Sequence, residues 1–270
     1  MASDHPPPPK VDPNEVERLR AHLNLVPQAR VACLAMIDAM GATDLNDFSV
    51  PKQTVFGLVA RSVGNLQGVD LLLRAERIVE ARTITRCLVE NLVLLASIYA
   101  RPDRTLEELQ RDFVKSRVVR ADILAKGGSD VIEPEQLARL QAFASDLRGR
   151  HPKTSYLNQT RLAADTFAEG AMATYSLLSD DAAHATVASL ARHILLQQSG
   201  ARELIPYPEP SVSEACHTAA TATNMTLGLL LGSRDIFGNA LGEQDILKLH
   251  TELSAVKARW PPRPGTLDPT

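Results

Sequence analysis

The sequence has 270 residues, of which 44% are hydrophobic and 23% are charged, and its formal net charge is −3. The hydrophobic and charged fractions are those of an ordinary globular protein, and the negative charge argues against broad electrostatic binding to nucleic acid or to an anionic membrane. Only 4% of the residues are aromatic. Because Ala and Leu are strong helix formers, whereas aromatic and β-branched residues favour strands, the composition predicts a helical protein.

Three cysteines, Cys33, Cys87 and Cys216, lie far apart along the chain. They fit neither a disulfide framework nor a zinc site, so we expect a reducing compartment, the cytoplasm. The first nine residues lack the apolar core of a signal peptide. The most apolar run, residues 87–100, contains Glu90 and is shorter than the ~18 residues that a membrane span needs. We therefore predict a core helix there, and no membrane span.

Proline-rich segments frame the chain at residues 6–9 and 261–264. Proline has no backbone N–H and is excluded from helix and sheet interiors, so both ends are expected to be extended. The sequence therefore predicts one helical domain over residues 13–259, with disordered ends at 1–12 and 260–270.

Proline, glycine and capping residues divide this domain into helices. Asp12 is positioned to cap a helix whose first residue is Pro13, and Thr105 and Glu108 have the spacing of a capping box. Helices are expected over residues 13–40 with a break near Pro27, 49–74, 76–99, 105–127, 134–147, 161–167, 169–178, 181–193, 212–237 and 243–259.

Residues 200–210 contain three alternating prolines, Pro206, Pro208 and Pro210, and are expected to form an extended loop. One short strand within residues 194–205 is a further expectation. No other segment shows period-two alternation or a repeating strand–helix pattern. The predicted fold class is an all-α, multi-helix bundle.

The first candidate site lies on the predicted helix 76–99. Arg82, Arg86 and Glu90 follow one another at intervals of four residues, so they share one helix face, and Arg86 and Glu90 can form an ion pair. If this face points inward, the pair is costly to desolvate unless other polar groups complete it, which suggests a purpose beyond stability. If the face is exposed, the pair contributes only about 0.3 kcal/mol and needs no function.

The second candidate site begins at Tyr175, about ninety residues after Arg86. Tyr175 and Ser179 are one helical turn apart, and Ser179, Asp180 and Asp181 are typical of a helix end that meets the cap of the next helix. His184 would then lie in the first turn of that next helix, where the helix dipole favours a neutral imidazole able to act as a base or a ligand. The plainer interpretation is that Ser179 and Asp181 are caps and His184 is a packed polar residue.

The other histidines and the glycines suggest no further chemistry. His22 and His250 are predicted to be solvated, and the spacing of His193 and His217 from His184 matches no metal motif. The sequence contains no zinc-protease, nucleophile-elbow, Walker or dinucleotide motif. It therefore predicts no metal site and leaves the cofactor unknown.

The stretch RTITRCLVENL at residues 82–92 resembles the signature helix of an uncharacterised bacterial family, DUF5677. Members of that family show an arginine and a glutamate four residues apart in an apolar helix, and further on a tyrosine, a serine four residues later, and a histidine. The matching residues here are Arg86, Glu90, Tyr175, Ser179 and His184. The resemblance covers roughly residues 55–210 and implies that these five residues form one polar site in a helical fold, without implying an activity.

Two functions fit these candidate residues. In the first, Arg86, Tyr175 and Ser179 bind a small anionic ligand, such as a phosphate ester or nucleotide, while Glu90 and His184 carry out proton transfer. In the second, the protein is a non-catalytic binding or regulatory module, in bacterial defence or stress response, and the polar cluster is purely structural.

A third function, a homo-oligomeric scaffold, would use the Ala- and Leu-rich helix 212–237. The leucines concerned are Leu227, Leu229, Leu230 and Leu231, which flank Gly228 and Gly232. Their plainer interpretation is ordinary core, which we favour.

Overall fold

The computed structural model describes residues 12–41, 48–127, 132–182, 186–196, 200–205, 211–238 and 242–261. Ten α-helices and one short β-hairpin are formed by these residues, so the predicted all-α fold class is confirmed. The helices are α1 (Pro13–Gly41), α2 (Val50–Arg74), α3 (Ile78–Ala100), α4 (Pro102–Gly127), α5 (Pro134–Arg150), α6 (Gln159–Ala163), α7 (Ala171–Ala182), α8 (Val187–Ala191), α9 (Val212–Phe237) and α10 (Glu243–Arg259).

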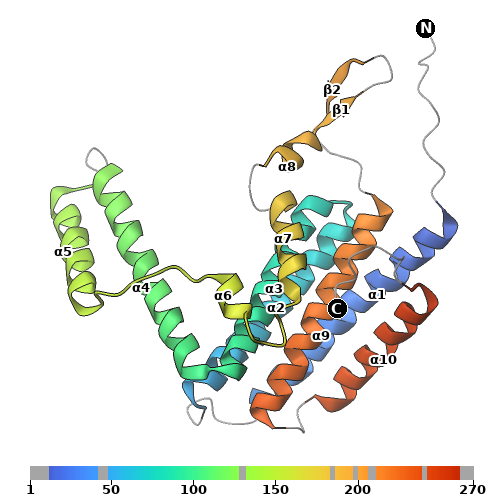
Figure 1. The fold of residues 1–270 in the computed structure, drawn as a ribbon, viewed down its shortest axis with the longest axis horizontal. Coiled ribbons are helices and arrows are strands. Elements are labelled where there is room, and N and C mark those ends of the chain that lie inside the picture. Colours follow the sequence, from blue (N-terminus) through green and yellow to red (C-terminus); the bar gives the residue numbers. More distant parts are fainter. Residues whose placement is uncertain are drawn as a thin grey trace.

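The main bundle consists of α1, α2, α3 and α9, with α10 against α1 and α7 against α3 (Figure 1). Its core is built from Leu, Val, Ala and Met, as the low aromatic content implies. Helix α9 packs closely on α3, because Gly228 lies against Leu92 and a Cβ on Gly232 would overlap the side chain of Leu95. Leu227, Leu229 and Leu230 are buried in the main core, so the interpretation of the α9 leucines as ordinary core is confirmed for these three.

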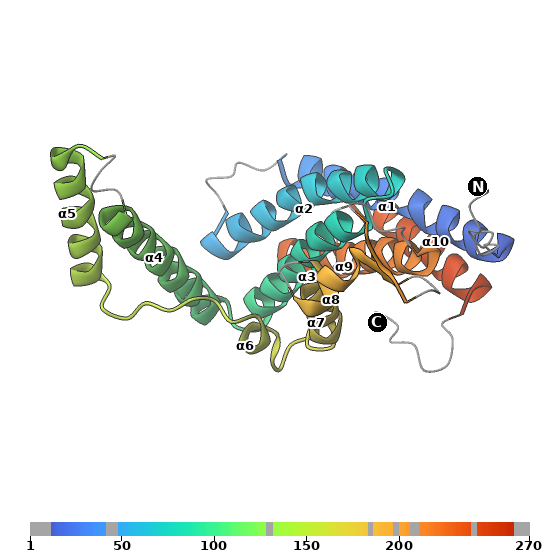
Figure 2. The same cartoon turned by 90° about the horizontal axis from the view of Figure 1, so that it is seen from above.

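Helices α4 and α5 form a hairpin that projects away from the bundle (Figures 1 and 2). A small separate core of Val114, Val118 and Leu147 holds the two helices together. The chain then returns as an extended segment, whose Leu157 N–H donates to the Asp112 carboxylate at 2.9 Å. The α4–α5 hairpin therefore stands beside the bundle and takes no part in its core.

The expected single strand is in fact two. β1 (Ile194–Leu196) pairs antiparallel with β2 (Arg202–Leu204), and Ile194 lies opposite Leu204. Residues 206–210, which carry the alternating prolines, lie outside the described part of the chain, as do residues 1–11 and 262–270.

The expected helix break near Pro27 and the expected capping box at Thr105 are wrong, whereas the expected cap at Asp12 is confirmed. Helix α1 continues through Pro27 without a break. Helix α4 begins at Pro102, because proline suits the first turn of a helix, and the Thr105 hydroxyl lies 3.0 Å from the Ser97 carbonyl instead of capping. The Asp12 carboxylate does cap α1, accepting from the Asn14 N–H at 2.9 Å.

Helix α3 is long and apolar enough, by length and composition alone, to cross a membrane. In the structure 56% of its most apolar window is buried within the protein. It also carries Arg82 and Asn91 among its buried residues, and Asn91 donates to the Ser62 hydroxyl of α2 at 2.9 Å. These features are those of the core helix that the sequence predicts.

Candidate functional site

The face of α3 that carries Arg86 and Glu90 lies against α7. Arg86 Nη2 and Glu90 Oε1 are 3.2 Å apart, so the expected ion pair is formed. Across the helix contact, Arg86 Nη1 lies 3.5 Å from the Tyr175 hydroxyl, and the guanidinium carbon is 5.3 Å from the centre of the Tyr175 ring. That position over the ring is within the range of a cation–π contact. Three of the five candidate residues are therefore in contact.

The Arg86–Glu90 pair lies at the boundary between core and solvent. The side chains of Arg86 and Glu90 are 21% and 20% exposed. Neither alternative of the sequence analysis applies fully, because the pair is neither a freely solvated surface pair nor a desolvated core pair. Arg86 Nε is buried and makes no hydrogen bond to a described residue. About a fifth of each side chain therefore remains open to solvent, while Arg86 contacts both Glu90 and Tyr175.

Ser179 does not act as a helix cap. Its hydroxyl donates to the Tyr175 carbonyl one turn earlier, at 2.8 Å, and α7 continues beyond it to Ala182. The expected helix start at Asp181 is wrong, since no glycine or proline ends α7 before that residue. Helix α8 begins only at Val187, capped by the Thr186 hydroxyl, which accepts from the Ser189 N–H.

His184 lies in the gap at residues 183–185, outside the described residues. Its part in the site therefore stays a prediction from the sequence. Within the described part of the chain, no hydrogen bond or ion pair joins Ser179 to Arg86 or Glu90. The contribution of Ser179 to ligand binding therefore also stays a prediction.

A second group of charges extends the site along α3. Arg82, one turn before Arg86, is only 4% exposed and donates to the Leu177 carbonyl of α7 at 3.4 Å. Glu214, in the first turn of α9, pairs with Arg192, which follows α8, and Arg192 Nη1 lies 3.2 Å from Glu214 Oε2. Four segments distant in sequence therefore meet here.

The electrostatic balance of this second group is set by its arginines. Burial raises the pKa of the Glu214 carboxyl, but the hydrogen bond from Arg192 and the positive charges of Arg192 and Arg82 outweigh it. The pKa of Glu214 therefore lies below its ordinary value, and this carboxylate is charged at neutral pH. The sequence indicates Arg82 by its four-residue spacing from Arg86. It does not indicate Arg192 and Glu214, which come together only in the tertiary structure.

The expectation that His22 is solvated is wrong. His22 is 4% exposed on α1, and its Nδ1 makes no hydrogen bond to a described residue. Burial first, and then the positive charges of Arg18 and Lys257, lowers its pKa to about 4. The ring is therefore neutral and packed in the core at neutral pH. His250 is exposed, as expected.

The cysteines form no disulfide, and the thiols of Cys33 and Cys216 are buried. All three are free, and burial raises the pKa of the Cys33 thiol to about 12 and that of Cys216 to about 11. Both thiols are therefore protonated at neutral pH and poorly nucleophilic. Within the described residues, no three His, Cys, Asp or Glu side chains are grouped as metal ligands.

A family model described as a family of unknown function, DUF5677, matches residues 53–201, which is more than half of the chain. The matched segment runs from the first turn of α2 to the β-hairpin and contains Arg82, Arg86, Glu90, Tyr175 and Arg192. Glu214 lies beyond it. No curated protein and no solved structure matches the chain.

Proposed function

We propose that this chain, which belongs to the DUF5677 family, binds a small anionic ligand through Arg86 at the contact between α3 and α7. The ligand class we propose is a phosphate ester or a nucleotide. Arg86 would supply the planar donors that phosphate and carboxylate groups accept in pairs, with Tyr175 beside it.

One observation carries this proposal: the Arg86 guanidinium is held between Glu90 and the Tyr175 ring while about a fifth of its side chain remains exposed. Arginine side chains lose considerable rotamer freedom when they bind a ligand. Here the Tyr175 ring and the Glu90 carboxylate already restrict the rotamers of Arg86 before a ligand binds, so less rotamer freedom is lost on binding. Such preorganisation favours binding over a purely packing role.

The charges support an anion. The arginines of the site are Arg82, Arg86 and Arg192, and its carboxylates are Glu90 and Glu214, so the arginines exceed the carboxylates by one. In a partly buried setting this positive excess is screened less by salt than it would be on an open surface.

Catalysis is the further part of the proposal. Glu90 touches the proposed anion-binding group and would orient it or accept a proton from a bound water or hydroxyl. His184, two residues beyond the end of α7, would be the partner in proton transfer. The setting we propose is the reducing cytoplasm of a bacterium, and the three free cysteines support its reducing character.

The second candidate function is a non-catalytic helical module in bacterial defence or stress response. It is favoured by Arg82, whose buried guanidinium reaches the Leu177 carbonyl and so joins α3 to α7. In that case the whole cluster would fix the arrangement of the helices, and Arg86 would serve stability alone.

Isothermal titration of the protein with inorganic phosphate, pyrophosphate and AMP tests the proposal. The variants are Arg86→Gln and, as a matched control, Arg74→Gln, because Arg74 pairs with Asp70 on α2 at the same spacing but far more exposed. We expect Arg86→Gln to weaken binding by about ten-fold or more, as the loss of a charged hydrogen bond implies. Unchanged binding with a lowered melting temperature would instead support the structural module.

A further inference from the structure

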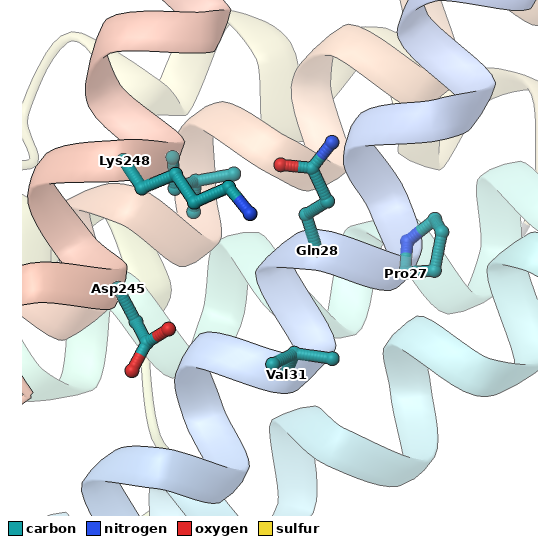
Figure 3. A pocket seen from close by; sticks show the side chains of 6 residues that line it. Pro27, Gln28, Val31, Asp245 and Lys248 are labelled. Carbon is teal, nitrogen blue, oxygen red and sulfur yellow. The ribbon is translucent and has the colours of Figure 1, made fainter.

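A cavity of about 210 Å³ lies between α1 and α10, on elements that take no part in the α3–α7 site (Figure 3). Helix α1 contributes Pro27, Gln28 and Val31 to its wall, and α10 contributes Asp245, Lys248 and Leu249. Pockets that hold drug-sized ligands measure roughly 300–1,000 Å³, so this cavity suits a smaller molecule than a nucleotide.

The cavity carries one charge of each sign. Asp245 and Lys248 are three residues apart on α10 and so face the same side of the helix. Within the described part of the chain neither forms an ion pair, and Figure 3 shows them apart, with the Lys248 ammonium extending towards Gln28. An unpaired carboxylate and an unpaired ammonium in one small cavity are complementary to a ligand that itself carries both charges.

Gln28 adds an amide group whose hydrogen-bonding potential is not fully used. Its Oε1 is buried and makes no hydrogen bond to a described residue. A buried acceptor without a donor costs free energy, which a donor on a bound molecule would recover. The amide also has two N–H donors, so it can contact either charged group of a ligand.

The remaining wall is apolar. Leu249 and Val31 both line the cavity, and they are 1% and 56% exposed. A large aliphatic side chain this open, next to a buried leucine and a proline ring, offers a surface on which a ligand's apolar group can be removed from water.

We infer that this cavity binds a free aliphatic α-amino acid. The α-ammonium of the ligand pairs with Asp245, its carboxylate pairs with Lys248, and its side chain lies against Val31 and Pro27. The size of the cavity, its two separate opposite charges and its apolar wall together select this class over a phosphate or a purely apolar ligand. The site is independent of the anion site on α3.

Equilibrium dialysis of the full chain with L-leucine and L-valine tests the inference, alongside N-acetyl-leucine, which lacks the ammonium, and leucinamide, which lacks the carboxylate. We expect saturable binding of both amino acids and at least about ten-fold weaker binding of either derivative, since each loses one charged hydrogen bond. Asp245→Asn should weaken leucine binding similarly, as should Lys248→Gln. Glu243→Gln, an exposed acid in the same first turn of α10, is the control and should leave binding unchanged.

Absence of saturable leucine and valine binding would overturn the inference. Equal affinity for leucine, N-acetyl-leucine and leucinamide would also overturn it, because charge recognition is its basis. Arg86→Gln should leave leucine binding unchanged, and a parallel loss would show that the two sites are not independent.

Discussion

The guanidinium of Arg86 lies over the ring of Tyr175, with its carbon 5.3 Å from the ring centre, although the two residues are 89 positions apart in the chain. Both residues lie within residues 53–201, the part of the chain that the DUF5677 family model matches. The contact limits the orientations that Arg86 can adopt, since the Tyr175 ring lies on one side and the Glu90 carboxylate 3.2 Å away on another. The proposed anion site depends on this restriction.

Replacement of Glu90 tests whether its negative charge competes with phosphate for Arg86 or is required for phosphate to bind. We expect Glu90→Gln to tighten the binding of inorganic phosphate by roughly five-fold. The glutamine oxygen can still accept from Arg86 and restrict its orientation, whereas the competing negative charge, worth about 1 kcal/mol at a partly exposed site, is removed. Calorimetric titration at low ionic strength measures the change. Weaker binding in this variant would mean that the negative charge of Glu90, and not only its hydrogen-bonding oxygen, is needed to orient Arg86.

We expect Arg82 to contribute to the stability of the fold and not to ligand binding. Arg82→Met should lower the free energy of unfolding by about 1–3 kcal/mol, since the buried guanidinium donates to the Leu177 carbonyl and lies near Glu214. Urea denaturation measures the loss, and Arg74→Met on α2, an exposed pair, should cost less than about 1 kcal/mol. Equal effects of the two variants would contradict a structural role for Arg82.

The close packing of α9 on α3 predicts opposite effects for two Gly→Ala substitutions. Gly232→Ala should destabilise the protein by about 1–3 kcal/mol, because the added Cβ overlaps Leu95 and also meets Phe167. Gly64→Ala on α2 should stabilise it by about 0.5–1 kcal/mol, since no atom lies near the new Cβ and alanine favours the helix. A neutral Gly232→Ala would show that α3 and α9 can separate without cost.

Buried His22 predicts a pH dependence of stability. Its pKa is about 4 in the folded protein and 6.5 by ordinary value, so the unfolded chain binds more protons between these pH values. Stability from this residue is complete above pH ~6.5 and is lost as the pH falls towards 4, by up to about 3 kcal/mol. Urea denaturation at several pH values measures the slope. The slope should shrink in His22→Leu and persist in His250→Gln, where the exposed ring is replaced.

The sequence predicts the helices well where a strong stop signal ends them. The bounds of α9 and α10 agree with prediction, because Pro210 precedes the first and Gly238 and Gly242 separate the two. Helix α7 was predicted to end too early, since the polar run from Ser179 to Asp181 resembles a cap but contains no residue that breaks a helix.

The candidate site was predictable only in its local part. The Arg86–Glu90 pair follows from helical spacing, and Tyr175 follows from the family resemblance. The pair of Arg192 and Glu214 forms between segments 22 residues apart that the intervening hairpin brings together, and nothing in the local sequence signals it. His22 was missed because polar and apolar residues are poorly separated along α1.

The central claim, that Arg86 binds an anion, is tested most directly by NMR of protein labelled with ¹⁵N-arginine. The Arg86 Nε–H signal, assigned by its loss in Arg86→Lys, is followed while inorganic phosphate is added, with Arg74 as the internal reference. The account predicts a saturable shift of the Arg86 signal and no comparable shift of Arg74. An unmoved Arg86 signal, or equal and unsaturated shifts at both arginines, would contradict it.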